Sequence, residues 1–75
     1  MKLKPDFNLS EFFQAVHNCR DEVLFETPEG DRLNLKSTLS QFVFTAAVAG
    51  KFRALNGKLS YSQMDESILA PFVLR

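Results

Sequence analysis

The sequence predicts an α+β fold, an open-faced two-layer sandwich in which helices cover one face of a small antiparallel sheet. Segments with apolar residues at helical spacing alternate with segments in which apolar and polar residues alternate one by one. Short groups of Pro, Gly and Asn separate these segments. The order of the elements is α-β-β-α-β-α, and the 75 residues contain no linker, so we expect a single domain over residues 1–75.

The first helix is expected over Leu9–Asn18. Asn8 precedes it as a capping residue, with Glu11 three positions further on, as in a capping box. The helix has an apolar stripe for the core, formed by Leu9, Phe12, Phe13 and Val16. Ahead of it, Met1–Lys4 offers only a short segment to a sheet edge, because Pro5 limits any strand there.

A β-hairpin follows the first helix. Its strands are predicted at Glu22–Thr27 and Arg32–Lys36, and the turn Pro28-Glu29-Gly30-Asp31 joins them. Leu33 and Leu35 fall on one face of the second strand. Polar residues fall on the other face, together with polar residues of the third strand, so we expect a solvated face that carries Arg32, Asn34, Lys36, Ser60 and Ser62.

The second helix is expected over Thr38–Arg53, with Ser37 as its N-cap. The hydroxyl of Ser37 is either a plain cap or part of a site that holds a phosphate at the helix N-terminus. A core-facing stripe is predicted at i, i+3, i+4 and i+7, formed by Leu39, Phe42, Val43 and Ala46. Phe44, Ala47 and Val48 are apolar too, and a helix that is apolar nearly all round is buried or meets a partner. A strand over Phe42–Thr45 is the alternative.

The remaining elements are short. A turn at Asn56-Gly57 leads into a third strand at Lys58–Ser62. Asp65 and Glu66 open a last helix, which Ser62 or Gln63 caps and which Ile68 and Leu69 dock on the core. Pro71 ends this helix, and residues 72–74 pack back as a tail.

Composition argues against several function classes. Nine basic and nine acidic residues give no formal net charge, which disfavours direct binding to nucleic acid. The longest uncharged run, Ser37–Gly50, is too short to span a bilayer, and no signal peptide is evident, so we expect a cytoplasmic protein without a membrane partner. One cysteine excludes an internal disulfide, and no metal-ligand spacing occurs, so no metal or cofactor is expected.

His17 and Cys19 are the two residues with side chains suited to nucleophilic or acid–base chemistry. His17 has no partner at helical spacing apart from Phe13. Cys19 has no evident cationic partner to lower its pKa except Arg20, which is next to it in the sequence and need not be close in space. We therefore expect a helix-end histidine and a structural thiol, no catalytic residues, and no enzymatic activity.

The segment Leu33-Asn34-Leu35-Lys36-Ser37, followed by an apolar helix, resembles the strand-to-helix junction of HPr, the phosphocarrier protein of the bacterial sugar phosphotransferase system. The order of elements from Asn8 to Leu69 is also similar. The resemblance implies an open-faced sandwich with an additional first strand. It implies an active-site histidine just before the first helix, and a regulatory serine, matched by Ser37, that a dedicated kinase phosphorylates in some bacteria.

The active histidine has no counterpart, because the positions before the first helix read Lys4-Pro5-Asp6-Phe7-Asn8. The chain is thus similar to the catabolite-repression paralogue of HPr, which lacks that histidine and acts through protein binding. We expect a non-catalytic interaction or regulatory domain, with a switch phosphorylated at Ser37 and a small homodimeric structural domain as alternatives. The resemblance implies a partner-binding region at Lys36, Ser37, Leu39 and Phe42.

The resemblance also places the last strand beside the first. Because that first strand is missing or reduced to Met1–Lys4, Lys58–Ser62 is expected to be an open edge. Such an edge invites pairing with a second chain. A homodimer is therefore expected, through this edge or through the outer face of the second helix.

Overall fold

The structure is a computed structural model and describes residues 1–4, 6–49 and 57–74. In this part of the chain, three α-helices and antiparallel strands form a small α+β fold, as predicted. The strands are β1 (Lys2–Leu3), β2 (Val23–Glu26), β3 (Arg32–Asn34), β4 (Lys58–Tyr61) and β5 (Val73–Leu74). The helices are α1 (Leu9–Asn18), α2 (Thr38–Ala49) and α4 (Glu66–Leu69), and the 3-10 turns η1 (Gln63–Asp65) and η2 (Ala70–Phe72) flank α4.

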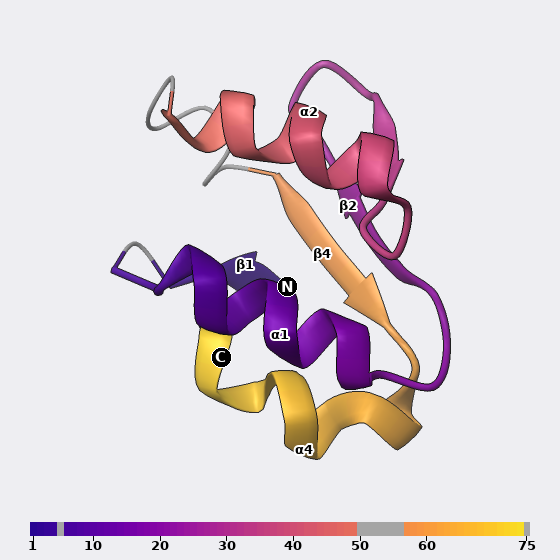
Figure 1. Ribbon diagram of the computed structural model, residues 1–75. Helices are drawn as coiled ribbons and strands as arrows, with labels where there is room; N and C mark the ends of the chain where they lie inside the picture. The colour runs from indigo at the N-terminus through magenta and orange to yellow at the C-terminus, as the bar shows by residue number, and fades with distance from the viewer. Residues whose placement is uncertain (5, 50–56, 75) are drawn as a thin grey trace.

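The central sheet has the order β3-β2-β4, and both pairings are antiparallel. Phe25 in β2 lies opposite Leu33 on one side and Leu59 on the other, so these side chains share one face. α1 and α2 cover this face of the sheet, and α4 lies against α1 (Figure 1). The other face carries mostly polar side chains, among them Arg32 and Ser60, and is more solvated, as the strand pattern predicted.

An aromatic cluster joins the helices to the sheet. The ring of Phe44 in α2 lies 5.0 Å from that of Phe25 in β2 and 5.8 Å from that of Phe12 in α1. All three side chains are fully buried, and Val16 and Val23 are buried with them. The core therefore forms where α1, α2 and β2 meet.

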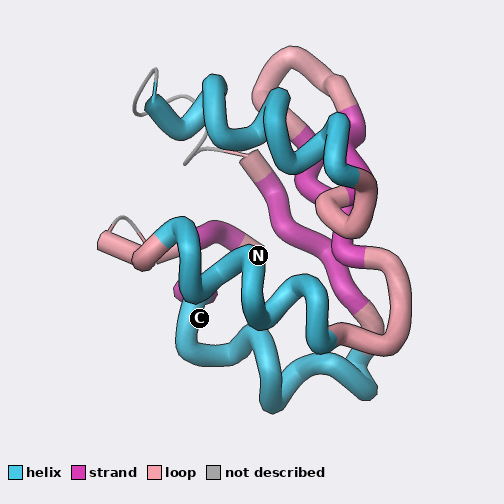
Figure 2. The backbone as a smooth tube through the Cα atoms, viewed as in Figure 1, coloured by secondary structure: helices cyan, strands magenta, loops and turns pink. Residues whose placement is uncertain are grey.

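The first helix begins and ends where the sequence predicts. Asn8 Oδ1 accepts the backbone N–H of Glu11 at 2.9 Å, which satisfies one of the free donors of the first turn. The predicted stripe is confirmed, since Phe12 and Val16 are fully buried and Leu9 and Phe13 pack against the core. Figure 2 shows α1 beside α4, which packs against it through the buried Leu69.

The hairpin turn depends on Gly30, whose φ of 97° is readily adopted only by glycine. Its N–H donates to the carbonyl of Thr27 at 2.9 Å, and the hydroxyl of Thr27 accepts the N–H of Asp31 at 3.0 Å. Gly57 is required for a different reason, because a Cβ there would lie 2.4 Å from the ring of Phe25. The sequence predicted both as turn glycines, but the close approach at Gly57 depends on the tertiary fold.

The N-terminal residues cover part of the β4 edge. The Met1 ammonium donates to the carbonyl of Leu59 at 3.0 Å, and the Leu59 N–H donates to the carbonyl of Met1 at 2.6 Å. The strand predicted to be an open edge is thus paired at Leu59. β1 also pairs with β5, so the predicted C-terminal tail packs back as a strand with Val73 buried.

Several predicted boundaries differ from the structure. β2 spans Val23–Glu26 rather than Glu22–Thr27. β3 ends at Asn34 rather than Lys36, and β4 ends one residue early, at Tyr61. The helix after β4 is broken into η1, α4 and η2, with Pro71 in η2. The predicted end of the second helix at Arg53 and the turn residue Asn56 lie outside the described residues. Among the described helices, none is long and apolar enough to cross a membrane.

Candidate functional site

The junction between β3 and α2 is the region that the sequence analysis selected. Asn34 ends the strand, since its side-chain oxygen accepts the N–H of Lys36 at 3.0 Å and its carbonyl accepts the N–H of Ser37 at 2.9 Å. The N–H of Leu35 still donates to the carbonyl of Val23 at 2.7 Å, and the Leu35 side chain is buried. These bonds turn the backbone from strand to helix within three residues, Leu35 to Ser37.

Ser37 is the residue before α2, and its carbonyl accepts the N–H of Gln41 at 2.9 Å, the first bond of the helix. Its hydroxyl lies 3.5 Å from the N–H of Ser40, a long contact for a capping hydrogen bond. The side chain is exposed. The predicted cap is therefore present, and its hydroxyl is accessible from solvent.

The predicted core stripe of the second helix is wrong. Leu39 is 73% exposed, Phe42 76% and Val43 45%, and Ala46 is exposed as well. Within residues 38–46, the part of α2 whose burial the structure describes, Phe44 is the buried residue. α2 is thus rotated so that its predicted core face points to solvent.

Two contacts account for this orientation. Gln41 Nε2 donates to the carbonyl of Leu35 at 2.7 Å, which holds that side of the helix against the junction. Phe44 fills the space between Phe12 and Phe25. Because the helix is apolar nearly all round, its pattern did not distinguish the face that carries Phe44 from the face that carries Phe42. The helical state itself is confirmed over Phe42–Thr45.

The exposed face of α2 concentrates apolar surface. Of the six large apolar side chains that are exposed among the described residues, Leu39, Phe42 and Val43 lie within five consecutive positions. Residues 38–49 contain no charged side chain. We refer to Leu39, Phe42, Val43 and Ala46 as the α2 face. Single exposed apolar residues are common on proteins, whereas a contiguous patch marks an interaction site.

Lys36 and Asp65 both bond to the backbone where α1 ends and in the two residues that follow. The Lys36 ammonium donates to the carbonyl of Cys19 at the end of α1. Asp65 is fully buried, and its two oxygens accept the N–H groups of Arg20 at 2.9 Å and Asp21 at 3.1 Å. The hydrogen bond from the Arg20 N–H lowers the pKa of the Asp65 carboxyl below its ordinary value. Sequence reasoning missed this buried carboxylate, because no local pattern marks it.

The structure places His17 and Cys19 in different environments. His17 is exposed in the last turn of α1, whereas Cys19 is buried and its Sγ donates to the carbonyl of Ala15 at 3.3 Å. Burial raises the pKa of the Cys19 thiol, which keeps it protonated and poorly nucleophilic. Among the residues that the structure describes, no group of three or more potential metal ligands occurs.

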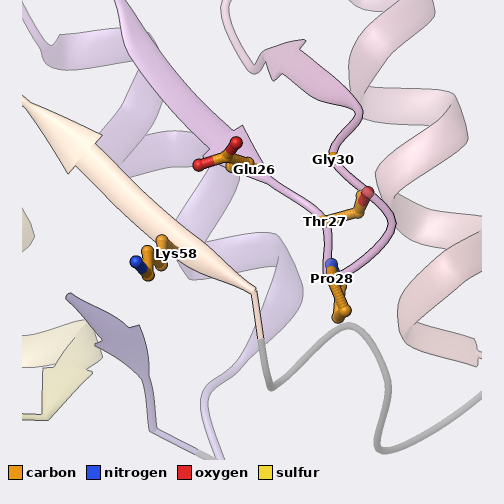
Figure 3. Close-up of a pocket in the computed structure, with 5 residues that line it drawn as sticks. All are labelled: Glu26, Thr27, Pro28, Gly30 and Lys58. Carbon is orange, nitrogen blue, oxygen red and sulfur yellow. The ribbon is translucent and has the colours of Figure 1, made fainter.

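Three hollows that are lined by described residues lie away from the junction. Figure 3 shows one of about 230 Å³, lined by residues of the hairpin turn and the start of β4: Glu26, Thr27, Pro28, Gly30 and Lys58. The Thr27 hydroxyl in this hollow already accepts the Asp31 N–H. The predicted partner-binding residues Leu39 and Phe42 line none of these hollows and are exposed on α2.

Comparison with known proteins gives no relative for this chain: no family model, no curated protein and no solved structure matches it.

Proposed function

We propose that this chain is a non-catalytic, HPr-like interaction domain that binds a protein partner through the α2 face. The observation that carries the proposal is the exposure of Leu39 and Phe42 on an uncharged helix directly after the Ser37 cap. A protein that leaves such a patch in water loses the stabilisation that burying it would give. The resemblance to HPr assigns partner contacts to the same two residues.

Two further features support the proposal. The pairing of Met1 with Leu59 brings β1 beside β4, the strand that the resemblance places next to the first one. The segment ahead of α1 contains no histidine, so the chemistry of a phosphocarrier has no side chain to act through. The chain retains the interaction face and lacks the phosphoryl-accepting group.

Affinity capture tests this proposal. The chain, tagged after residue 75, is used to capture proteins from the source cell, and the captured proteins are identified by mass spectrometry. Phe42→Ser is expected to abolish the specific capture. Met64→Ser is the matched control, because Met64 is 64% exposed on η1, and it should leave the capture unchanged. Capture that is insensitive to Phe42→Ser rejects the α2 face as the binding surface.

A regulatory switch at Ser37 is the second candidate. Its hydroxyl is exposed and makes only the long 3.5 Å contact with Ser40, so a kinase can reach it without disrupting a strong bond. A phosphate there would meet the positive end of the α2 dipole. Treatment with an HPr kinase and ATP should add one phosphate in intact-mass spectra, and Ser37→Ala should prevent it. No added phosphate, or a phosphate elsewhere, rejects the switch.

A further inference from the structure

The four residues of the α2 face are spaced so that two copies of the face can pack against each other. Its members stand at i, i+3, i+4 and i+7, so they form one continuous stripe along the helix. We propose that two copies of this chain associate through the α2 face, with the two helices antiparallel about a two-fold axis that passes between Phe42 and Val43. The inference rests on the proposed function, because it names an occupant for the face that binds.

The side chains of the stripe are complementary in size under this axis. Leu39 faces the partner's Ala46, and Phe42 faces the partner's Val43. Each contact joins a larger side chain to a smaller one, and the same contacts recur on the other side of the axis, as an isologous interface requires. In a parallel pair, Phe42 would meet the partner's Phe42 and Ala46 would meet the partner's Ala46. That arrangement brings two large side chains together at Phe42 and leaves a gap between two small ones at Ala46.

Charge also favours a second copy. The residues of α2 carry no ionisable side chain, and the chain has no formal net charge. Two identical helices therefore meet without like-charge repulsion, while a charged partner finds nothing on α2 to pair with. Gln41, the amide of this helix, is turned toward the junction, where it donates to the carbonyl of Leu35. The surface offered to the second copy is thus apolar.

The area of the face limits the strength of association. A typical stable interface buries about 800 Å² per partner, and an aromatic side chain supplies about 150–250 Å² when it is fully buried. Phe42 and Leu39 are about three-quarters exposed, and Val43 and Ala46 add smaller areas. The α2 face thus provides on the order of half the area of a stable dimer interface. We expect a reversible dimer that dissociates on dilution.

Sedimentation equilibrium of the untagged chain, from about 10 µM to about 1 mM, tests the association. The weight-average mass should rise from the monomer toward twice that value. Phe42→Ser and Leu39→Glu should keep the chain monomeric throughout, and circular dichroism establishes that both variants are folded. Met64→Ser should behave as the wild type. A wild-type monomer over the whole range, or a dimer that persists in Phe42→Ser, overturns the proposal.

Crosslinking tests the orientation. Leu39→Cys and Ala46→Cys variants, distinguished by mass, are mixed and oxidised by copper phenanthroline. The antiparallel pairing predicts that the mixed disulfide forms faster than either homodimeric disulfide. Faster formation of the disulfide between two Leu39→Cys chains overturns the two-fold axis proposed here. A monomer that still captures another protein in a Phe42-dependent way overturns self-association and leaves the proposed function standing.

Discussion

The carboxylate of Asp65 accepts the backbone N–H of Arg20 at 2.9 Å, although 45 positions separate the two residues in the chain. Its second oxygen accepts the N–H of Asp21 at 3.1 Å. Asp65 lies in η1 and is fully buried. This one side chain therefore fastens the loop that leaves α1 to the segment that follows β4.

Acid should destabilise the protein through this carboxylate. Hydrogen bonding from Arg20 lowers the pKa of Asp65 in the folded state, so its contribution to stability is fully present above the pKa of an unfolded Asp, about 3.9. The contribution is lost as the pH falls through the lower folded pKa. The midpoint temperature of thermal unfolding is measured for each protein from about pH 7 to about pH 2. It should fall further for the wild type than for Asp65→Asn. Asp6→Asn is the control and should lose as much midpoint temperature as the wild type. Equal losses in the wild type and Asp65→Asn would contradict the prediction.

The orientation of α2 predicts opposite outcomes for two phenylalanines two positions apart. Phe44 is fully buried between Phe12 and Phe25, so Phe44→Ala should lower the free energy of unfolding by about 3–5 kcal/mol. Phe42 is 76% exposed, so Phe42→Ala should change it by less than about 0.5 kcal/mol in the monomer. Urea denaturation at low protein concentration measures both. If Phe42→Ala destabilises the protein more than Phe44→Ala, then α2 packs on the core through Phe42 and not through Phe44.

The two helix caps should differ in strength. The capping bond from Glu11 N–H to Asn8 is 2.9 Å long, whereas the contact from Ser40 N–H to Ser37 is 3.5 Å. Asn8→Ala should therefore cost about 1 kcal/mol and Ser37→Ala about 0.5 kcal/mol, the low end of the capping range. Ser37→Asp should be close to neutral, because Asp also caps and its charge favours the helix N-terminus. Chemical denaturation of the three variants checks the ranking, which fails if Ser37→Ala proves the most harmful.

The thiol of Cys19 should react slowly in the native protein. It is buried, its Sγ donates to the carbonyl of Ala15, and burial raises its pKa. Reaction with a chromogenic disulfide reagent at neutral pH should be slow without urea and fast with it. Met64→Cys, which adds a thiol at an exposed position, should supply one fast native equivalent beside the slow one. A fast native reaction of the wild type would show that the thiol is accessible.

Gly57 should tolerate a side chain poorly, although the sequence marks it only as a turn residue. An added Cβ would lie 2.4 Å from the ring of Phe25 and 2.5 Å from the carbonyl oxygen of Glu26. Gly57→Ala should therefore destabilise the fold by about 1–3 kcal/mol, through displacement of a core ring and a strand. At Gly30 there is no atom within 4 Å of the added Cβ, so Gly30→Ala should cost only the strain of its positive φ, about 1–2 kcal/mol. Differential scanning calorimetry compares the stability of Gly57→Ala with that of Gly30→Ala. The ring-proton resonances of Phe25 should shift in Gly57→Ala but not in Gly30→Ala.

The features that could be predicted from the sequence depend on residues close together in the chain. Asn8 and Glu11 are three positions apart, and the groups that shape the hairpin turn lie between Thr27 and Asp31. Hydrogen-bonding groups this close meet whenever the local backbone conformation forms, so residue type and spacing identify them. The position of Ser37 at the end of the strand-to-helix junction was predicted for the same reason.

The features that could not be predicted depend on contacts between distant segments. Asp65 and Arg20 are 45 positions apart in the chain, and Met1 and Leu59 are 58 positions apart, so no local pattern predicts their contacts. The direction of α2 was mistaken because Phe42 and Phe44 are equivalent in hydropathy, and only the space left by Phe12 and Phe25 selects Phe44. Two further positions of the candidate site, Val43 and Ala46, were assigned to the core for that reason.

The exchange of backbone hydrogen bonds between Met1 and Leu59 bears on how the protein can be handled. An affinity tag or fluorophore attached ahead of Met1 would replace the ammonium that donates to Leu59 and would begin alongside β4. The hairpin turn at Glu29 and Gly30 is exposed, but it depends on the positive φ of Gly30 and on the bond from the Asp31 N–H to the Thr27 hydroxyl. A reporter attached to the Met64→Cys variant, whose position is exposed, would leave both the Met1–Leu59 bonds and the hairpin turn in place.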